Sequence, residues 1–248
     1  MKLLAFELAT EACSVALWVD GDVRERFELA PRRHAELALP WAQQLLAQSG
    51  IARSQLDAIA VGRGPGAFTG VRLAIAIGQG IALALDRPMV SVSTLAALAM
   101  RAAPSSSPDA RRSDDAGGTH DGVLAAIDAR MNEVYVGRFE LRDGEALALG
   151  DETIAAPDAV DLSGIGGDWH GVGSGFAALG GALAQRLSPR LRSIDAGALP
   201  HAADVARLAA ASFARGEAIA PESIEPAYLR NNVALTIAEQ QSLRDSRS

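Results

Sequence analysis

Short apolar runs and one amphipathic stretch make up the first fifty residues of the chain. Three of the runs predict consecutive antiparallel strands, the last two joined by an Asp20-Gly21 turn, at residues 2–8, 15–19 and 24–29. The amphipathic stretch predicts a helix over residues 34–48, because apolar residues recur at helical spacing and a Ser-Gly stop signal follows. Its apolar stripe consists of Leu37, Trp41 and Leu45.

A nearly continuous apolar segment comes next. Residues 57–61 predict a short buried strand, and residues 71–85 predict a helix whose only strongly polar side chains are Arg72 and Gln79. A helix of this length rises about 22 Å at ~1.5 Å per residue, less than the ~30 Å of a bilayer core, so we expect burial in protein. Gly78 and Gly80 each cost about 1 kcal/mol relative to alanine, which indicates close approach of a second helix.

The second half of the chain repeats the order of the first. A strand at 89–92 and a helix at about 94–100 end the first half, and residues 101–121 predict an insertion or mobile linker poor in large apolar residues. Strands and helices then recur at 123–127, 133–140, 146–154, around 171–173, 176–187 and 201–213. This repeat predicts an α/β fold of two tandem actin-like (ribonuclease H-like) domains, each a mixed β-sheet with flanking helices. We expect domains at 1–100 and 122–222 and a C-terminal extension at 223–248.

Composition and charge narrow the class of protein. A chain of 248 residues with 49% hydrophobic residues can bury a large core. Cys13 is the only cysteine, so no intrachain disulfide can form. The sequence before the first predicted strand does not resemble a signal peptide, which has a charged segment followed by an apolar one, and both observations favour the cytoplasm. A net charge of −7 and a pI near 5.1 predict that the chain does not hold nucleic acid alone.

A glycine-rich turn, with Gly64, Pro65, Gly66 and Gly70, joins the predicted strand 57–61 to the helix that follows. The spacing from Gly62 formally fits a dinucleotide-binding fingerprint, but the next strand lacks the acidic residue at its end. The turn does not match a phosphate-binding P-loop either, because Gly70 is followed by Val-Arg, whereas a P-loop has Lys followed by Ser or Thr at this point. Two interpretations remain: an anion site at free helix amides with Thr69 as N-cap, or a tight turn for close packing, which we favour.

Several segments closely resemble one known family, TsaB (also called YeaZ). They are residues 3–17, 62–72, 126–135 and 225–233. The resemblance covers nearly the whole chain except the insertion and the last dozen residues. It implies a bacterial subunit of the machinery that places a threonylcarbamoyl group on N6 of the adenosine next to the anticodon of tRNAs. In that family the paralogue TsaD performs the transfer, the ATPase TsaE joins the assembly, and a separate enzyme makes threonylcarbamoyl-adenylate.

The residues agree with a role without catalysis. TsaD-like proteins carry a His-x-x-x-His metal pair where this chain has residues 92–98 without histidine, so we expect no metal site. The family usually has Asp where this chain has Glu7, which places nucleotide hydrolysis in doubt. Glu7, Thr10, Gly173 and Ser174 are candidates for a vestigial nucleotide cleft, although Gly173 and Ser174 also fit an ordinary strand-to-helix turn. No cofactor is expected to be required by this chain, and the sequence leaves open whether ATP or ADP binds at the interface of the complex.

The helices predicted at residues 34–48 and 71–85 are expected to form the surface that contacts another protein subunit. They would pack on the same pair of helices in a TsaD-like partner, or in a second copy when the chain is alone, through Leu37, Trp41, Leu45, Val71, Ile75, Gly78 and Gln79. The chain is expected to contact tRNA only indirectly, as part of the complex, and it is not expected to associate with a membrane.

The sequence leaves two other classes of function to consider. The alternative is an independent actin-like ATPase or small-molecule kinase. A peptidase is disfavoured, because Ser174 lies in Gly-x-Gly-Ser-Gly rather than Gly-x-Ser-x-Gly.

Overall fold

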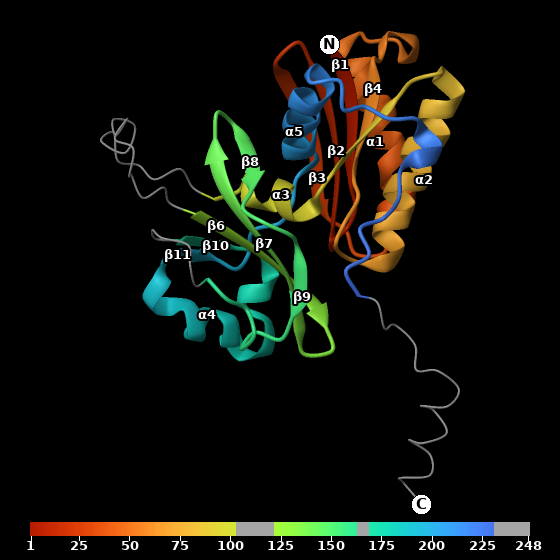
Figure 1. The fold of residues 1–248 in the computed structure, drawn as a ribbon. Helices are drawn as coiled ribbons and strands as arrows, with labels where there is room; N and C mark the ends of the chain where they lie inside the picture. Colours follow the sequence, from red (N-terminus) through yellow and green to blue (C-terminus); the bar gives the residue numbers. More distant parts are fainter. Residues whose placement is uncertain (103–121, 163–168, 231–248) are drawn as a thin grey trace, which may run out of the picture.

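Two mixed β-sheets with flanking helices form the computed structural model, which describes residues 1–102, 122–162 and 169–230 (Figure 1). The first sheet has the order β3-β2-β1-β4-β5. Its strands are β1 (Lys2–Glu7), β2 (Ala12–Val19), β3 (Asp22–Leu29), β4 (Ala58–Gly62) and β5 (Met89–Val92). Strand β1 runs antiparallel to β2 and parallel to β4, so the sheet is mixed.

The second sheet has the order β11-β10-β6-β7-β8, with β9 paired to β7. Its strands are β6 (Gly122–Arg130), β7 (Glu133–Arg142), β8 (Glu145–Ala148), β9 (Thr153–Ala155), β10 (Trp169–Val172) and β11 (Leu191–Asp195). Sequence patterning merged β8 and β9 into one strand and missed β11, whose residues are mostly exposed and carry no apolar run. The prediction of an α/β fold with two mixed sheets is confirmed.

Five α-helices are described: α1 (His34–Ser49), α2 (Phe68–Leu85), α3 (Thr94–Ala99), α4 (Ala182–Leu187) and α5 (Ala202–Ala214). Short 3-10 turns accompany them: η1 (Arg53–Gln55), η3 (Ser174–Phe176), η4 (Ala178–Gly181), η5 (Ser188–Arg190) and η6 (Pro221–Ser223). The predicted helix 176–187 is wrong in its first half, because Leu179, Gly180 and Gly181 have positive φ and interrupt it. Pro40 does not break α1, which is continuous.

Strands β1, β2 and β4 of the first sheet are buried on both faces because alternate side chains enter different cores, whereas the residues of the edge strand β3 are partly or fully exposed. Leu4 and Phe6 of β1 pack with α1 and α2, whereas Leu3 and Ala5 pack with α5. The core that contains Leu3 continues through α3 and α5 to β6 and β7, so these two helices form a layer between the sheets. A third core lies between the second sheet and α4. We call the first sheet with α1 and α2 the first lobe, and the second sheet with α4 the second lobe.

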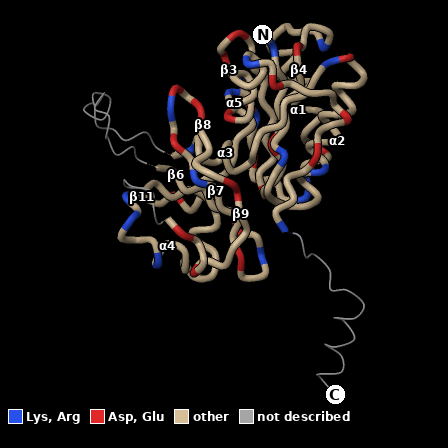
Figure 2. Tube along the Cα trace, viewed as in Figure 1, with Lys and Arg blue, Asp and Glu red and all other residues tan. Residues whose placement is uncertain are grey.

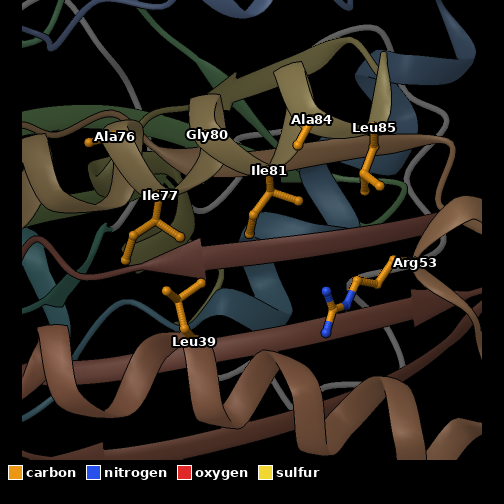
Figure 3. Close-up of a pocket in the computed structure, with 8 residues that line it drawn as sticks. All are labelled: Leu39, Arg53, Ala76, Ile77, Gly80, Ile81, Ala84 and Leu85. Atoms are coloured by element: carbon orange, nitrogen blue, oxygen red, sulfur yellow. The ribbon is translucent and has the colours of Figure 1, made fainter.

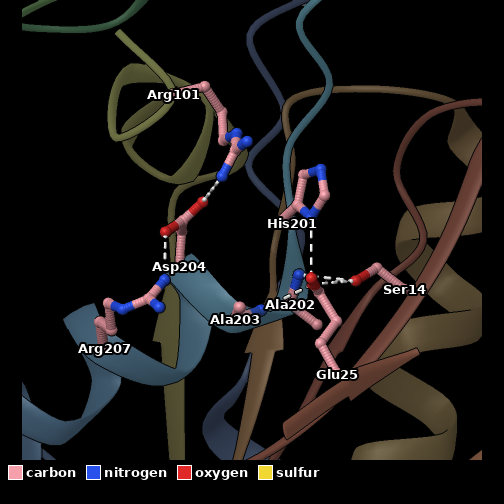
Figure 4. A network of polar contacts seen from close by, with 8 residues as sticks. All are labelled: Ser14, Glu25, Arg101, His201, Ala202, Ala203, Asp204 and Arg207. Carbon is pink, nitrogen blue, oxygen red and sulfur yellow. Dashed lines mark hydrogen bonds and ion pairs between the residues drawn. The ribbon is translucent and has the colours of Figure 1, made fainter. Parts of the chain in front are cut away.

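Helix α5 is fixed to the first sheet by a carboxylate at its N-terminus (Figure 4). Glu25 of β3 accepts hydrogen bonds from the Ser14 hydroxyl (2.7 Å), the Ala203 amide (3.0 Å) and His201 Nδ1 (2.9 Å). Ser14 Oγ in turn accepts from the Ala202 amide at 2.8 Å. Burial alone would raise the pKa of Glu25, but these hydrogen bonds outweigh it and lower the pKa.

The position of α5 bears on the domain boundaries. Residues 202–214 belong to the predicted second domain, yet they pack on β1 and β2 of the first sheet. The division at 100, 121 and 222 stays a prediction, and residues 122–222 contribute to the packing of both sheets. The predicted insertion lies almost entirely outside the described residues, as does the end of the C-terminal extension from residue 231.

Helix α2 differs from its prediction in length and in the packing of its glycines. It has 18 residues, about 27 Å at ~1.5 Å per residue. Within the described part of the chain it alone is long and apolar enough to cross a membrane, a test that the core helices of other proteins also pass, so its length by itself does not decide between burial and a span. Gly78 faces its own sheet, where a Cβ would lie 2.6 Å from Val61 Cγ1, while Gly80 faces open space. Close approach at Gly78 is therefore to strands, not to a second helix.

Candidate functional site

The glycine turn is pressed against the end of β1. A Cβ on Gly70 would lie 2.0 Å from the Leu8 carbonyl oxygen, and one on Gly66 would lie 2.4 Å from the Ala9 oxygen. The Ala67 amide donates to the Ala9 carbonyl at 2.7 Å. These contacts explain the glycines as positions where two backbones meet.

Gly64 and Ala67 of the turn already donate their amides within the chain. The Gly64 amide donates to Thr94 Oγ1 at 3.2 Å, and the Thr94 amide donates to the Gly64 carbonyl at 2.9 Å. Pro65, which follows a cis peptide bond, is buried. Thr69 is not the N-cap: Ala67 holds that position without a side-chain hydrogen bond, and Thr69 lies inside the helix. The geometry favours the packing interpretation over an anion site.

Glu7 lies directly beneath this turn and is 1% exposed. Its Oε1 accepts from the Ala9 amide at 2.8 Å, and its Oε2 accepts from the Thr94 hydroxyl at 3.0 Å. Gly62 leaves room for the carboxylate, because a Cβ there would lie 1.9 Å from Oε2. Burial raises the pKa of Glu7 from its ordinary value of 4.5 to about 7, against the lowering effect of these hydrogen bonds.

The other cleft candidates serve local structure. Thr10 Oγ1 accepts from the Ala12 amide at 3.3 Å, and Ser174 Oγ accepts from the Asp128 amide at 3.2 Å. Gly173 has φ of +105° and passes so close to β6 that a Cβ would lie 2.4 Å from the Ala126 oxygen. None of the hydrogen bonds found in the described residues joins Glu7 or Thr10 to Gly173 or Ser174.

The histidines of the described chain are engaged individually. His34 Nε2 lies 3.0 Å from the Thr10 carbonyl oxygen, His170 Nδ1 lies 2.8 Å from Ser193 Oγ, and His201 contacts Glu25 and stacks on Phe27. His120 lies outside the described residues. Over residues 1–102, 122–162 and 169–230 no three His, Cys, Asp or Glu side chains gather as a metal site.

Most of the predicted interface residues point inward. Trp41, Leu45, Val71, Ile75 and Gly78 are buried against the first sheet. Leu37 is partly buried in the same core, and Gln79 donates to the carbonyls of Pro221 (2.8 Å) and Ile224 (3.3 Å). The helices were predicted correctly, but the side chains named for docking are those that hold the helices to their own sheet.

Other side chains form the outer surface of α1 and α2 (Figure 3). A groove of about 380 Å³ runs between the helices and η1 and is lined by Leu39, Arg53, Ala76, Ile77, Gly80, Ile81, Ala84 and Leu85. Beyond it Phe68 is 64% exposed and Leu83 is 62% exposed. Apart from Arg53, no charged residue lines this groove, so the groove is apolar.

Sequence reasoning missed this outer surface. A signal existed, because Phe68, Arg72, Ala76, Gly80 and Ala84 recur every four residues along one side of α2. Small residues in the middle of that row leave the helix backbone open to close approach by another helix.

Comparison with known proteins gives consistent matches. Residues 28–238 match the family described as TsaD: tRNA N6-adenosine threonylcarbamoyltransferase. The tRNA threonylcarbamoyladenosine biosynthesis protein TsaB of Escherichia coli is 44% identical over 238 residues, covering 94% of this chain and 96% of that protein. The Haemophilus influenzae protein of the same name is 37% identical over 241 residues, covering 94% and 95%. The solved structure of YeaZ from Pseudomonas aeruginosa has a TM-score of 0.76 and 42% identity, covering 92% of this chain and 99% of that one.

Proposed function

Because the chain belongs to the TsaB (YeaZ) family of tRNA threonylcarbamoyladenosine biosynthesis proteins, we propose that it is the dimerisation and activating subunit of the transfer complex. It takes part in forming N6-threonylcarbamoyladenosine next to the anticodon of tRNA. The transfer itself is assigned to a TsaD-like partner, and a TsaE-like ATPase joins the assembly. Alone, the chain forms a homodimer through the same surface.

The apolar groove between α1 and α2 carries this proposal. A groove lined by Leu39, Ile77 and Ile81 beside the exposed Phe68 and Leu83 is costly to leave in water. The row of small residues on α2 fits a facing helix rather than a small ligand. The occupant we assign is the corresponding helix pair of the TsaD-like protein.

No cofactor is required of this chain in the proposal. The carboxylate oxygens of Glu7 are occupied by Ala9 and Thr94, and Glu7 is closed off from solvent, so it is poorly placed to orient a metal-bound phosphate. ATP or ADP is therefore placed at the interface with the partner. The proposed compartment is the cytoplasm.

Contact with tRNA is assigned to the partner. Figure 2 shows Lys and Arg interspersed with Asp and Glu over both lobes of the described trace, and the net charge is −7. A surface of this kind attracts a polyanion weakly.

Reconstitution tests the proposal. Modification of tRNA by the TsaD-like protein, the TsaE-like protein and threonylcarbamoyl-adenylate should proceed with this chain and fall to background without it. The chain alone should modify nothing. Saturable ATP turnover by the isolated chain, lost on Glu7→Ala, would instead favour an independent ATPase.

Placing a charge in the groove should separate the subunits. Leu39→Glu buries a carboxylate in any complex that covers the groove, so we expect affinity for the TsaD-like protein to fall by at least about tenfold, or ~1.4 kcal/mol. Leu39 is 45% exposed in the isolated chain, so folding should be unaffected. Titration calorimetry measures the affinity.

A matched variant controls for the added charge. Leu147→Glu on β8 changes a side chain that is 39% exposed on the second lobe, and it should bind like the unmodified chain. Equal loss of affinity in both variants, or in neither, would remove the groove from the interface.

A further inference from the structure

The segment after η6 runs beside α2 of the first lobe (Figure 1), and the side chain of its last described residue, Arg230, contacts the second lobe. We call residues 224–230 the strap. At its start Gln79 of α2 holds the Ile224 carbonyl at 3.3 Å, and further along the Ala227 amide donates to the Arg63 carbonyl at 2.8 Å. This part of the strap is fixed to α2 and to the glycine turn.

Arg72 of α2 holds the middle of the strap. Its guanidinium lies 3.2 Å from the centroid of the Phe68 ring and 5.0 Å from that of Tyr228, and it donates a hydrogen bond to the Tyr228 hydroxyl. Cation–π contacts of this kind contribute about 0.5–1 kcal/mol at exposed sites. The stack is thus a fastening on the outside of the first lobe.

Arg230 ends the strap on the second lobe. Its Nη2 lies 2.8 Å from Glu133 Oε2 and donates to the Ala129 carbonyl at 3.1 Å, and its Nη1 lies 3.0 Å from Met131 Sδ. The side chain of Arg230 is only 15% exposed. One arginine therefore contacts both arms of the β6–β7 hairpin, and charge-assisted bonds of this geometry are among the stronger ones.

The turn that Arg230 grips is conformationally costly. Arg130, Met131 and Asn132 have φ of +62°, +54° and +64°, which L-residues rarely adopt, least of all in sequence. Such a turn persists where surrounding contacts over-determine it. The contacts from Arg230 are of that kind, so the hairpin and the strap stabilise each other.

The lobes are also joined elsewhere by the shared core of α3 and α5. We propose that the strap fixes the angle between the lobes, and we call this arrangement the clasp. The contacts of Arg230 hold the strap on the second lobe, and without them the lobes would move relative to each other about the shared core of α3 and α5. Arg72 and Phe68 lie on the outer side of α2. Through the clasp, a change in what covers that side of α2 would therefore affect the position of the second lobe.

A distance measurement between spin labels tests the clasp on the full chain. Labels are placed through Gln43→Cys on α1 and Asp158→Cys in the second lobe, both exposed, while the native Cys13 is buried. Arg230→Ala should broaden the distance distribution and raise the population away from the main distance by roughly tenfold, equivalent to ~1.4 kcal/mol. Arg230→Lys keeps one charge-assisted bond and should give an intermediate distribution.

Two comparisons decide the result. Arg142→Ala removes the same charge, but Arg142 pairs with Glu140 on its own strand, so the distribution should stay narrow. Arg72→Ala should broaden it less than Arg230→Ala does. The hydrogen bonds from Gln79 and to the Arg63 carbonyl still hold the strap on the first lobe in that variant. A distribution unchanged by Arg230→Ala, or broadened equally by Arg142→Ala, overturns the clasp.

Discussion

Gly70→Ala is expected to destabilise the protein by about 3 kcal/mol or more, at the upper end of what overpacking costs. The added Cβ would lie 2.0 Å from the Leu8 carbonyl oxygen, 3.1 Å from its carbonyl carbon and 3.6 Å from Ala9 Cα. All three atoms belong to the backbone, so no side-chain rotation relieves the contact. The better helix propensity of alanine, worth about 1 kcal/mol, offsets only part of this cost. Urea unfolding followed by circular dichroism measures the difference.

Gly80→Ala is the matched control in the same helix. No atom beyond the neighbouring residues and backbone of its own helix lies within 4 Å of a Cβ built on Gly80, so only the difference in helix propensity applies and stability should rise by up to about 1 kcal/mol. If both substitutions had the same effect, α2 would not be held against the end of β1 as the structure has it.

Periodicity predicted the two sheets and the long helices because burial is regular there. Alternating residues of β1 enter two cores, and Leu37, Trp41 and Leu45 do mark the inner side of α1. Periodicity could not orient α2, since apolar residues lie on every side of it and give no contrast between inside and outside. For the same reason the apolar pattern does not distinguish Val71 and Ile75, which are buried, from residues on the outer side of the helix.

The candidate site was harder to predict because its contacts join distant parts of the chain. The burial and hydrogen bonding of the Glu7 carboxylate depend on Gly62 and Thr94, which follow it by 55 and 87 positions in the sequence. Only the folded structure brings these two residues next to Glu7. Arg230 sits in an extended segment without periodicity, so the sequence carried no signal that it reaches the β6–β7 turn. Close packing at the glycine turn, in contrast, followed from the residue types themselves.

Glu7→Gln is expected to flatten the dependence of stability on pH. In the folded protein the pKa of Glu7 is about 7, whereas in the unfolded chain it returns to 4.5. Between these values the folded state holds a proton that the unfolded state has released. Stability therefore falls as pH rises, by roughly 1.4 kcal/mol for each pH unit in that window, and levels off above pH 7. Glutamine carries no proton to lose, so this slope should vanish in the variant.

The curves of stability against pH for Glu7→Gln and for the unmodified chain should cross. Near pH 5 the carboxyl of Glu7 is protonated and Glu7→Gln should be equal or slightly less stable, because its amide must replace the acceptor that Thr94 now uses. At pH 8 the unmodified chain contains a buried ionised carboxylate and glutamine should be the more stable. Thermal unfolding from pH 5 to pH 8 measures the crossing, with the exposed Glu222→Gln as a control that should follow the unmodified curve. Parallel curves for Glu7→Gln and the unmodified chain would mean that Glu7 is open to solvent, and it would again be a candidate ligand for a metal-bound phosphate.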